Sequence, residues 1–184
     1  MKEPAELLVL YFVVPLWVLA GWMDWMCHRR TDIEHTAGAK ESAIHLLMFA
    51  QMGVPVLAGL FLEINALVLG IMMLAFVTHE ATAYWDLRVA SRSRYVSAFE
   101  QRVHSYLELL PLAALLLLSA AHWPQVVGLF GMSSAGDFSI SWKEDPLATG
   151  YLVSVLMAVA ALLVAPFGEE FYRCRKALHA GGDV

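Results

Sequence analysis

The chain has few of the residues that stabilise small secreted domains or bind nucleic acids. Its 184 residues include two cysteines, Cys27 and Cys174, which are too few for a disulfide framework. Charged residues make up 16% of the chain and the formal net charge is −5, so no basic nucleic-acid-binding surface is expected. A glycine-rich phosphate-binding loop and an internal repeat are also absent from the sequence. We interpret both cysteines as small apolar side chains.

Most of the sequence consists of long apolar segments. Hydrophobic residues make up 59% of the chain and the mean hydropathy is +0.61, which is too apolar for an ordinary soluble domain. The first residues, MKEPAE, lack the basic region of a secretory signal, so we interpret the first apolar segment as a true span. Each segment approaches the roughly 20 residues that cross a bilayer core. We predict a single all-α domain over residues 1–184, a polytopic membrane helix bundle with five transmembrane helices at about 7–27, 44–62, 66–87, 104–122 and 147–167.

The basic residues indicate an orientation in the membrane. Ten of the 12 Lys and Arg residues lie in segments 28–43 and 88–103 and in the C-terminal tail, whereas Lys2 and Lys143 lie on the other side. Cytoplasmic loops carry an excess of Lys and Arg. We therefore expect the N-terminus outside and the C-terminus in the cytoplasm, in a bacterial-type inner or plasma membrane, with the lipid bilayer as a direct partner.

Carboxylate and histidine side chains recur at helical spacing near the ends of the apolar segments. An acid four residues before a histidine shares its helix face, and chance would give about 0.65 such pairs here, whereas three occur. A further histidine and aspartate, seven residues apart, also share a face. The predicted topology brings all four pairs to the cytoplasmic ends of the first four spans. These candidate metal ligands are Asp24, His28, Glu41, His45, His79, Asp86, Glu100 and His104.

This set of side chains predicts a metal site. Imidazole and carboxylate groups are preferred by iron, zinc and manganese, and ionisable groups within spans are costly and usually functional. One ion would need three or four ligands, and the sequence offers eight candidates. We therefore predict two metal ions, with iron favoured over zinc or manganese. Each pair taken singly also fits a helix-end ion pair at the level of the lipid headgroups. The fifth span is expected only to pack against the others.

Further polar residues near the predicted site are candidates for holding the ligands in position. His35 is also compatible with simple solvation, and Glu80 with an ion pair to an arginine. Three arginines after the third span would either attract an anionic lipid headgroup or only determine topology. The candidates for the surrounding layer are Glu34, His35, Glu80 and Glu108, and the arginines are Arg88, Arg92 and Arg94.

The paired side chains of the first four spans resemble two groups of metalloproteins. Carboxylate and histidine pairs on four helices resemble the di-iron bundles of ferritin-like proteins and of the membrane-bound alternative oxidases, where the spacing is Glu-x-x-His, one residue shorter. A His-rich site at the ends of spans is also similar to membrane fatty-acid desaturases and hydroxylases, whose His-x-x-His-His boxes this chain lacks. The resemblance implies oxygen activation at two irons, a lipid or other small hydrophobic substrate, and an electron donor protein.

Three functions are compatible with these patterns. The first is a membrane-embedded di-metal oxidoreductase of the oxygenase, hydroxylase or desaturase type. The second is a zinc hydrolase, in which three ligands leave an open position for water and a spare glutamate acts as general base. The third is a metal or proton transporter or a haem-binding membrane subunit, although transport sites usually lie near the bilayer midplane.

Overall fold

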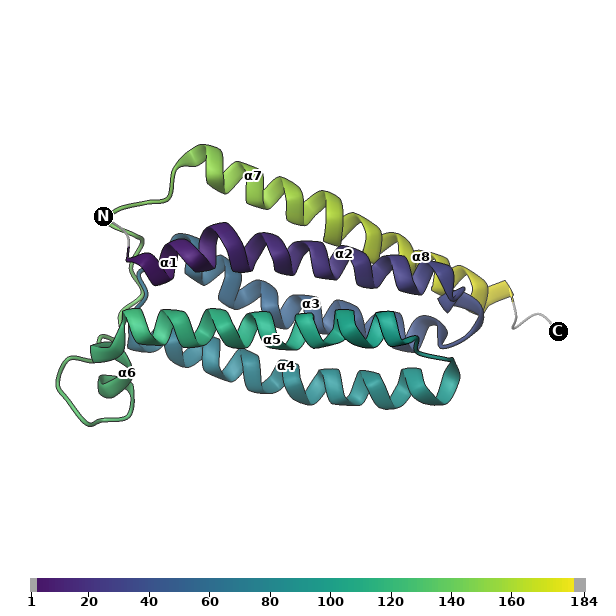
Figure 1. Ribbon diagram of the computed structural model, residues 1–184, viewed down its shortest axis with the longest axis horizontal. Coiled ribbons are helices and arrows are strands. Elements are labelled where there is room, and N and C mark those ends of the chain that lie inside the picture. The colour runs from purple at the N-terminus through teal and green to yellow at the C-terminus, as the bar shows by residue number, and fades with distance from the viewer. Residues whose placement is uncertain (1–2, 181–184) are drawn as a thin grey trace.

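The computed structural model describes residues 3–180, which form an elongated helical bundle (Figure 1). Within that range, five helical rods are long and apolar enough to cross a membrane. This confirms the predicted all-α bundle of five potential spans. The rods run over Pro4–Arg30, Gly38–Phe61, Ala66–Ser93, Ala98–Ala121 and Thr149–Ala180.

The first and fifth rods each contain a five-residue π-helical stretch, and in both a proline follows two residues after it. These prolines are Pro15 and Pro166. Proline has no N–H and its ring clashes with the carbonyl four residues earlier, so a wider π turn allows the rod to continue through it. The first rod comprises α1 (Pro4–Leu8), η1 (Val9–Val13) and α2 (Val14–Arg30), the middle rods are α3 (Gly38–Phe61), α4 (Ala66–Ser93) and α5 (Ala98–Ala121), and the fifth comprises α7 (Thr149–Val159), η3 (Ala160–Val164) and α8 (Ala165–Ala180).

At one end of the bundle the helices continue beyond the predicted apolar segments. We call it the basic end, because all ten Lys and Arg residues counted above toward the cytoplasm fall in the segments there. Helix α3 begins six residues earlier than expected and α5 also begins six residues earlier. Ser97 caps α5 by accepting a hydrogen bond from the Glu100 N–H at 3.1 Å. These extra turns place Glu41 and Glu100 on helices rather than in loops.

Apolar packing and a long connection close the opposite end. Leu69 of α4 packs in a buried cluster with Val126 of α6 (Trp123–Leu129), a short helix in the connection between the fourth and fifth rods. The rest of this connection is anchored to the start of α4, where the Asn65 side-chain amide donates to the Ser139 carbonyl at 2.8 Å. The opposite end is therefore held mainly by apolar contacts and hydrogen bonds.

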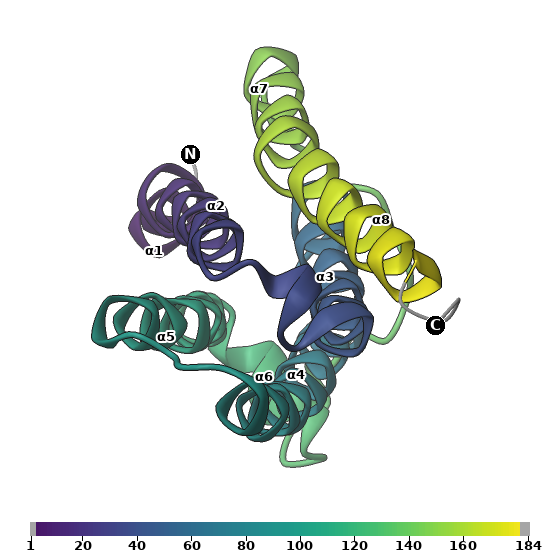
Figure 2. The same cartoon turned by 90° about the vertical axis from the view of Figure 1, so that its right-hand side faces the viewer.

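Viewed onto the basic end, helix α3 lies between α4 and α8, and α2 and α5 lie together on one side of this row (Figure 2). Helix α3 packs closely against both α4 and α8, and α2 packs against α5. All five rods thus reach the basic end. The fifth rod, which was expected only to pack, brings α8 alongside the helices that carry the predicted ligands.

Candidate metal centre

Eight carboxylate and histidine side chains gather inside the basic end, and we call them the carboxylate–histidine cluster. They come from α2, α3, α4, α5 and α8, and they form three overlapping groups with the spacing needed to hold a metal ion. Every member except His104 is less than 5% exposed. Seven of the eight are residues selected from the sequence. The members are Asp24, His28, Glu41, His45, Asp86, Glu100, His104 and Glu170.

The first group joins α2 to α5. His28 Nε2 lies 3.6 Å from Asp24 Oδ2 and 3.9 Å from Glu100 Oε1, and His104 Nε2 lies 3.0 Å from Asp24 Oδ1. Nitrogen and oxygen ligands lie about 2.0–2.2 Å from a transition metal, so two ligands of one ion are separated by about 3–4 Å. These four side chains therefore have the spacing of a single coordination sphere.

The second group joins α3 to α4. His45 Nε2 lies 3.2 Å from Asp86 Oδ1, and the ligand atoms of Glu41, His45 and Asp86 all lie within 4.8 Å of one another. Glu41 and His45 lie four residues apart on α3, which puts them on one helix face. This group could hold a second ion beside the first.

Glu170 of α8 connects the two groups through their histidines. Its carboxylate accepts from His28 Nδ1 at 3.1 Å and from His45 Nδ1 at 3.4 Å, and the two rings stack with centroids 4.4 Å apart. A carboxylate only accepts, so each Nδ1 carries a proton, and the Nε2 of each ring lies toward the carboxylates of its group, where a metal ion would take the place of a proton. Metal-ligating histidines characteristically bond a carboxylate through the other ring nitrogen in this way.

Arg94, in the loop between α4 and α5, bridges the groups a second time. Its Nη2 lies 2.6 Å from Glu41 Oε1 and 2.6 Å from Glu100 Oε1, and its side chain is 2% exposed. Burial disfavours the charged guanidinium, but hydrogen bonds to Glu100 and Glu41 raise the pKa of Arg94 above its ordinary value. The guanidinium is therefore a permanent positive charge at the cluster.

The charges of the cluster do not balance once its histidines are neutral, which is the form that binds a metal ion. Among the described residues, five buried carboxylates and one arginine then sum to −4, whereas protonated histidines would supply part of the positive charge in the metal-free cluster. Burying uncompensated charge is very costly. Two divalent cations would supply the missing +4, and the nitrogen and oxygen donors suit iron, zinc or manganese. The residues present therefore fit a pair of such ions.

Other predicted residues lie outside the three groups. His79 is buried but lies apart from them, beside an apolar cavity. Glu34 forms an ion pair with Arg173 of α8, and His35 is exposed to solvent. Glu80 and Glu108 influence each other electrostatically between α4 and α5, and neither belongs to the cluster.

Glu170 and the role of Arg94 were not found from the sequence. Helical spacing relates a histidine only to an acid on the same helix face, whereas Glu170 contacts histidines 142 and 125 residues away. One signal was present: Glu169 and Glu170 follow the fifth apolar segment at the same predicted depth as the other ligands. Arg94 resembled the neighbouring arginines of a basic loop, because sequence does not reveal that its guanidinium turns inward.

An apolar cavity of about 240 Å³ adjoins the cluster inside the bundle. Asp24 and His45 form its wall on the cluster side, and most of the remaining lining is aliphatic, aromatic or methionine side chains such as Trp17, Met48 and Val159. The cluster is therefore next to a space suited to an apolar molecule.

The chain was compared with known proteins. No protein-family model, curated protein or solved structure matches it. The chemistry of the centre must therefore be argued from its side chains. They offer two adjacent sets of nitrogen and oxygen ligands with compensating charge for two cations, open on one side to an apolar cavity.

Proposed function

We propose that this protein is a membrane-embedded di-metal oxidoreductase that acts with O2 on a lipid or another membrane-soluble substrate. One observation carries the proposal: a buried cluster of five carboxylates and three histidines, spaced as ligands of a metal ion would be, adjoins an apolar cavity. Iron is the favoured metal, because a redox-active ion in a nitrogen and oxygen site would supply the activation of O2. An apolar cavity would admit a hydrophobic substrate and keep water out.

The side chains at the basic end would have two roles: some would bind the metal ions, and others would hold these ligands in position. The Nε2 atoms of His28 and His45 would each face one ion, because Glu170 holds the proton of both rings on Nδ1. Arg94 would keep two of the carboxylates in place by balancing part of their charge. One ion would be held by Asp24, His28, Glu100 and His104, and the other by Glu41, His45 and Asp86.

We also propose that the basic end faces the cytoplasm. The excess of arginine and lysine at this end supports that orientation. An electron donor protein would then approach the cluster from the cytoplasmic side. The substrate would enter laterally from the cytoplasmic leaflet.

Elemental analysis of detergent-purified protein tests the proposal. We expect about two iron ions per chain in the unchanged protein. His45→Ala and Glu100→Ala should each lower the iron content, because each removes a ligand from a different group. His122→Ala is the matched control, since His122 pairs with Glu6 at the opposite end, and it should retain the full iron content.

Two results would redirect the proposal. Unchanged metal content in both His45→Ala and Glu100→Ala would exclude the cluster as the metal centre. About one zinc ion per chain, with a product that forms in the absence of O2, would instead indicate a membrane zinc hydrolase.

A further inference from the structure

His79 is the one buried histidine of the predicted set that the cluster does not use. It is 6% exposed, it lines the apolar cavity, and its Nδ1 has no hydrogen-bond partner in the part of the chain that the structure describes. It lies seven residues from Asp86 on α4, which is about 10 Å along the helix. A buried polar atom without a partner is costly, so this nitrogen marks a place where a ligand group would be stabilised.

The protonation of the ring defines what His79 can bind. The His79 ring lies beside the backbone of Met48 on α3, and its Nδ1 has no partner among the described residues. In the tautomer that carries its proton on Nε2, this Nδ1 is a hydrogen-bond acceptor. For this tautomer the complementary ligand group is a donor such as a hydroxyl, because a carbonyl or an ether has no proton to donate.

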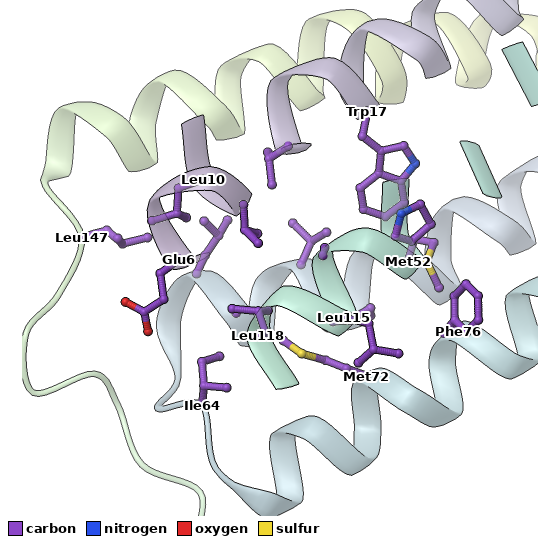
Figure 3. Close-up of a pocket in the computed structure, with 18 of the residues that line it drawn as sticks. Glu6, Leu10, Trp17, Met52, Ile64, Met72, Phe76, Leu115, Leu118 and Leu147 are labelled. Carbon is purple, nitrogen blue, oxygen red and sulfur yellow. The ribbon is translucent and has the colours of Figure 1, made fainter. Parts of the chain in front are cut away.

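The cavity beside His79 continues toward the opposite end of the bundle. A second apolar cavity of about 100 Å³ extends from Trp17 to Leu118 and Glu6 (Figure 3). Together the two cavities extend along the helices from Asp24, beside the cluster, to Glu6 at the far end. Five lining residues belong to both, so the cavities adjoin: Val14, Trp17, Met52, Val56 and Leu60.

We propose that the two cavities form one binding tract for a single long, linear, uncharged lipid whose hydroxyl group donates a hydrogen bond to His79 Nδ1. The chain would lie along the tract, with one part beside Asp24 and His45. The proposal rests on the proposed function in taking the cluster as the reaction centre, and it specifies the substrate class as a long-chain alcohol.

The lining beside His79 disfavours charged lipid heads. A carboxylate or phosphate head there would be desolvated among side chains that include no lysine or arginine, whereas Lys143 lines only the cavity at the far end. The two cavities share lining residues and reach opposite parts of the bundle, so one extended chain can occupy both. A hydroxyl on a flexible chain satisfies both the shape and the one acceptor.

Two pairs of variants probe the tract without touching the proposed ligands. Gly53 lines the larger cavity, and a Cβ placed there would meet open space, so Gly53→Leu should fill the tract. Gly150 also faces open space but lies outside both cavities, so Gly150→Leu is its control. His79→Phe removes the acceptor at similar size, and His79→Gln restores an acceptor oxygen.

The probe is 1-hexadecanol carrying a photoreactive diazirine in its chain, incorporated with the full-length protein into phosphatidylcholine nanodiscs. Mass spectrometry after illumination should place label on Met48 and Met52 inside the tract, above the background on outward residues such as Leu74 and Val77. His79→Phe should reduce labelling of the tract about five- to tenfold, His79→Gln should recover much of it, and Gly53→Leu should abolish it. Gly150→Leu should leave it unchanged.

Competition and metal content complete the test. Unlabelled 1-hexadecanol should displace the probe from the tract, whereas hexadecyl methyl ether and hexadecanoate should not. Label confined to outward residues, equal competition by the ether, or full labelling of Gly53→Leu would overturn the proposal. Iron is measured on the same samples: intact iron without tract labelling rejects only the lipid site, and selective labelling without any metal rejects only the di-metal assignment.

Discussion

The two ends of the bundle each contain a histidine in contact with a glutamate, and the contacts are almost equal in length. At the opposite end His122 Nε2 lies 3.0 Å from Glu6 Oε1, and at the basic end His28 Nδ1 lies 3.1 Å from Glu170 Oε2. The first pair is 25% and 19% exposed, whereas the second is fully buried. The same contact is thus a partly solvated ion pair at one end and part of a dense buried network at the other.

This difference shows what distinguishes a candidate metal centre from a helix-end ion pair. A histidine–carboxylate contact is uninformative alone, because water and salt can satisfy both charges at the surface. At the basic end, five carboxylates share one buried space with three histidines and a single arginine, and their charge exceeds what the protein supplies once the histidines are neutral. This density of buried carboxylates and imidazoles, and not the single contact, is what favours bound cations.

The largest effect is expected when the arginine of the cluster is removed. Arg94→Met leaves Glu41 and Glu100 buried without their cationic partner, so we expect metal-free protein to lose about 3–5 kcal/mol of stability. Arg29→Met is the control, because the Arg29–Glu169 pair is about half exposed, and it should cost at most about 1 kcal/mol. Denaturant unfolding in detergent micelles after chelation measures both.

The pH dependence of the Arg94 contribution follows from the direction of its pKa shift. The pKa of Arg94 is raised in the folded protein, so its stabilising effect is fully present below the ordinary arginine pKa and is lost only as the pH rises through the raised value. The loss in Arg94→Met should therefore persist across neutral pH. A loss no larger than that of Arg29→Met would show that the buried carboxylates are already neutral.

A second comparison concerns the caps that begin α4 and α5 at opposite ends. Asn65 accepts from the Val68 N–H and also donates to Ser139 and Asp137, and it is 4% exposed. Asn65→Ala should therefore cost about 2–3 kcal/mol, the sum of a lost cap and buried hydrogen bonds. Ser97→Ala removes only a cap and should cost about 1 kcal/mol. Equal thermal shifts for the two variants would contradict the anchoring role of Asn65.

Periodicity and charge were sufficient to predict the five rods and the shared end of the ligand-bearing helices. Apolar length defines a span, and the four-residue spacing of Glu41 and His45 fixes their common face once a helix is assumed. These are local properties of the chain. They predicted seven of the eight members of the cluster, because those seven residues lie on helices whose ends must meet at one side of a bundle.

The remaining features depend on how helices rotate and pack, which sequence spacing does not specify. His79 and Asp86 share a face of α4, yet His79 lies about 10 Å deeper and reaches the cavity instead of the cluster. Glu170 lies on a helix without a partner histidine of its own, so its position depends on the packing of α8 against α3. Arg94 turns inward because the two glutamates are already buried there.

Glu170 and its neighbour Glu169 offer a comparison within a single turn. Glu170→Gln keeps the shape but places an NH2 group against one of the two histidines, so one imidazole loses the acceptor that fixes its tautomer. We expect metal affinity to fall about 10–100-fold. Glu169→Gln should leave it unchanged, because Glu169 is half exposed and pairs with Arg29 and Arg173. Competition with a chromophoric chelator measures the affinity, and equal affinities would remove Glu170 from the centre.

The smallest effect is expected at the opposite end of the bundle, where a substitution of His122 can be compared with a substitution of His28 at the basic end. His122→Leu removes one member of a partly exposed pair, so it should change the free energy of unfolding by less than about 1 kcal/mol and leave the metal content unchanged. His28→Leu, at the basic end, should lower metal content and stability together, since it removes a ligand and leaves Glu170 with only one imidazole. Equal changes in metal content and in the free energy of unfolding for the two variants would contradict this comparison. Burial would then not explain the difference between the two ends, and the buried carboxylates would no longer support the presence of metal ions.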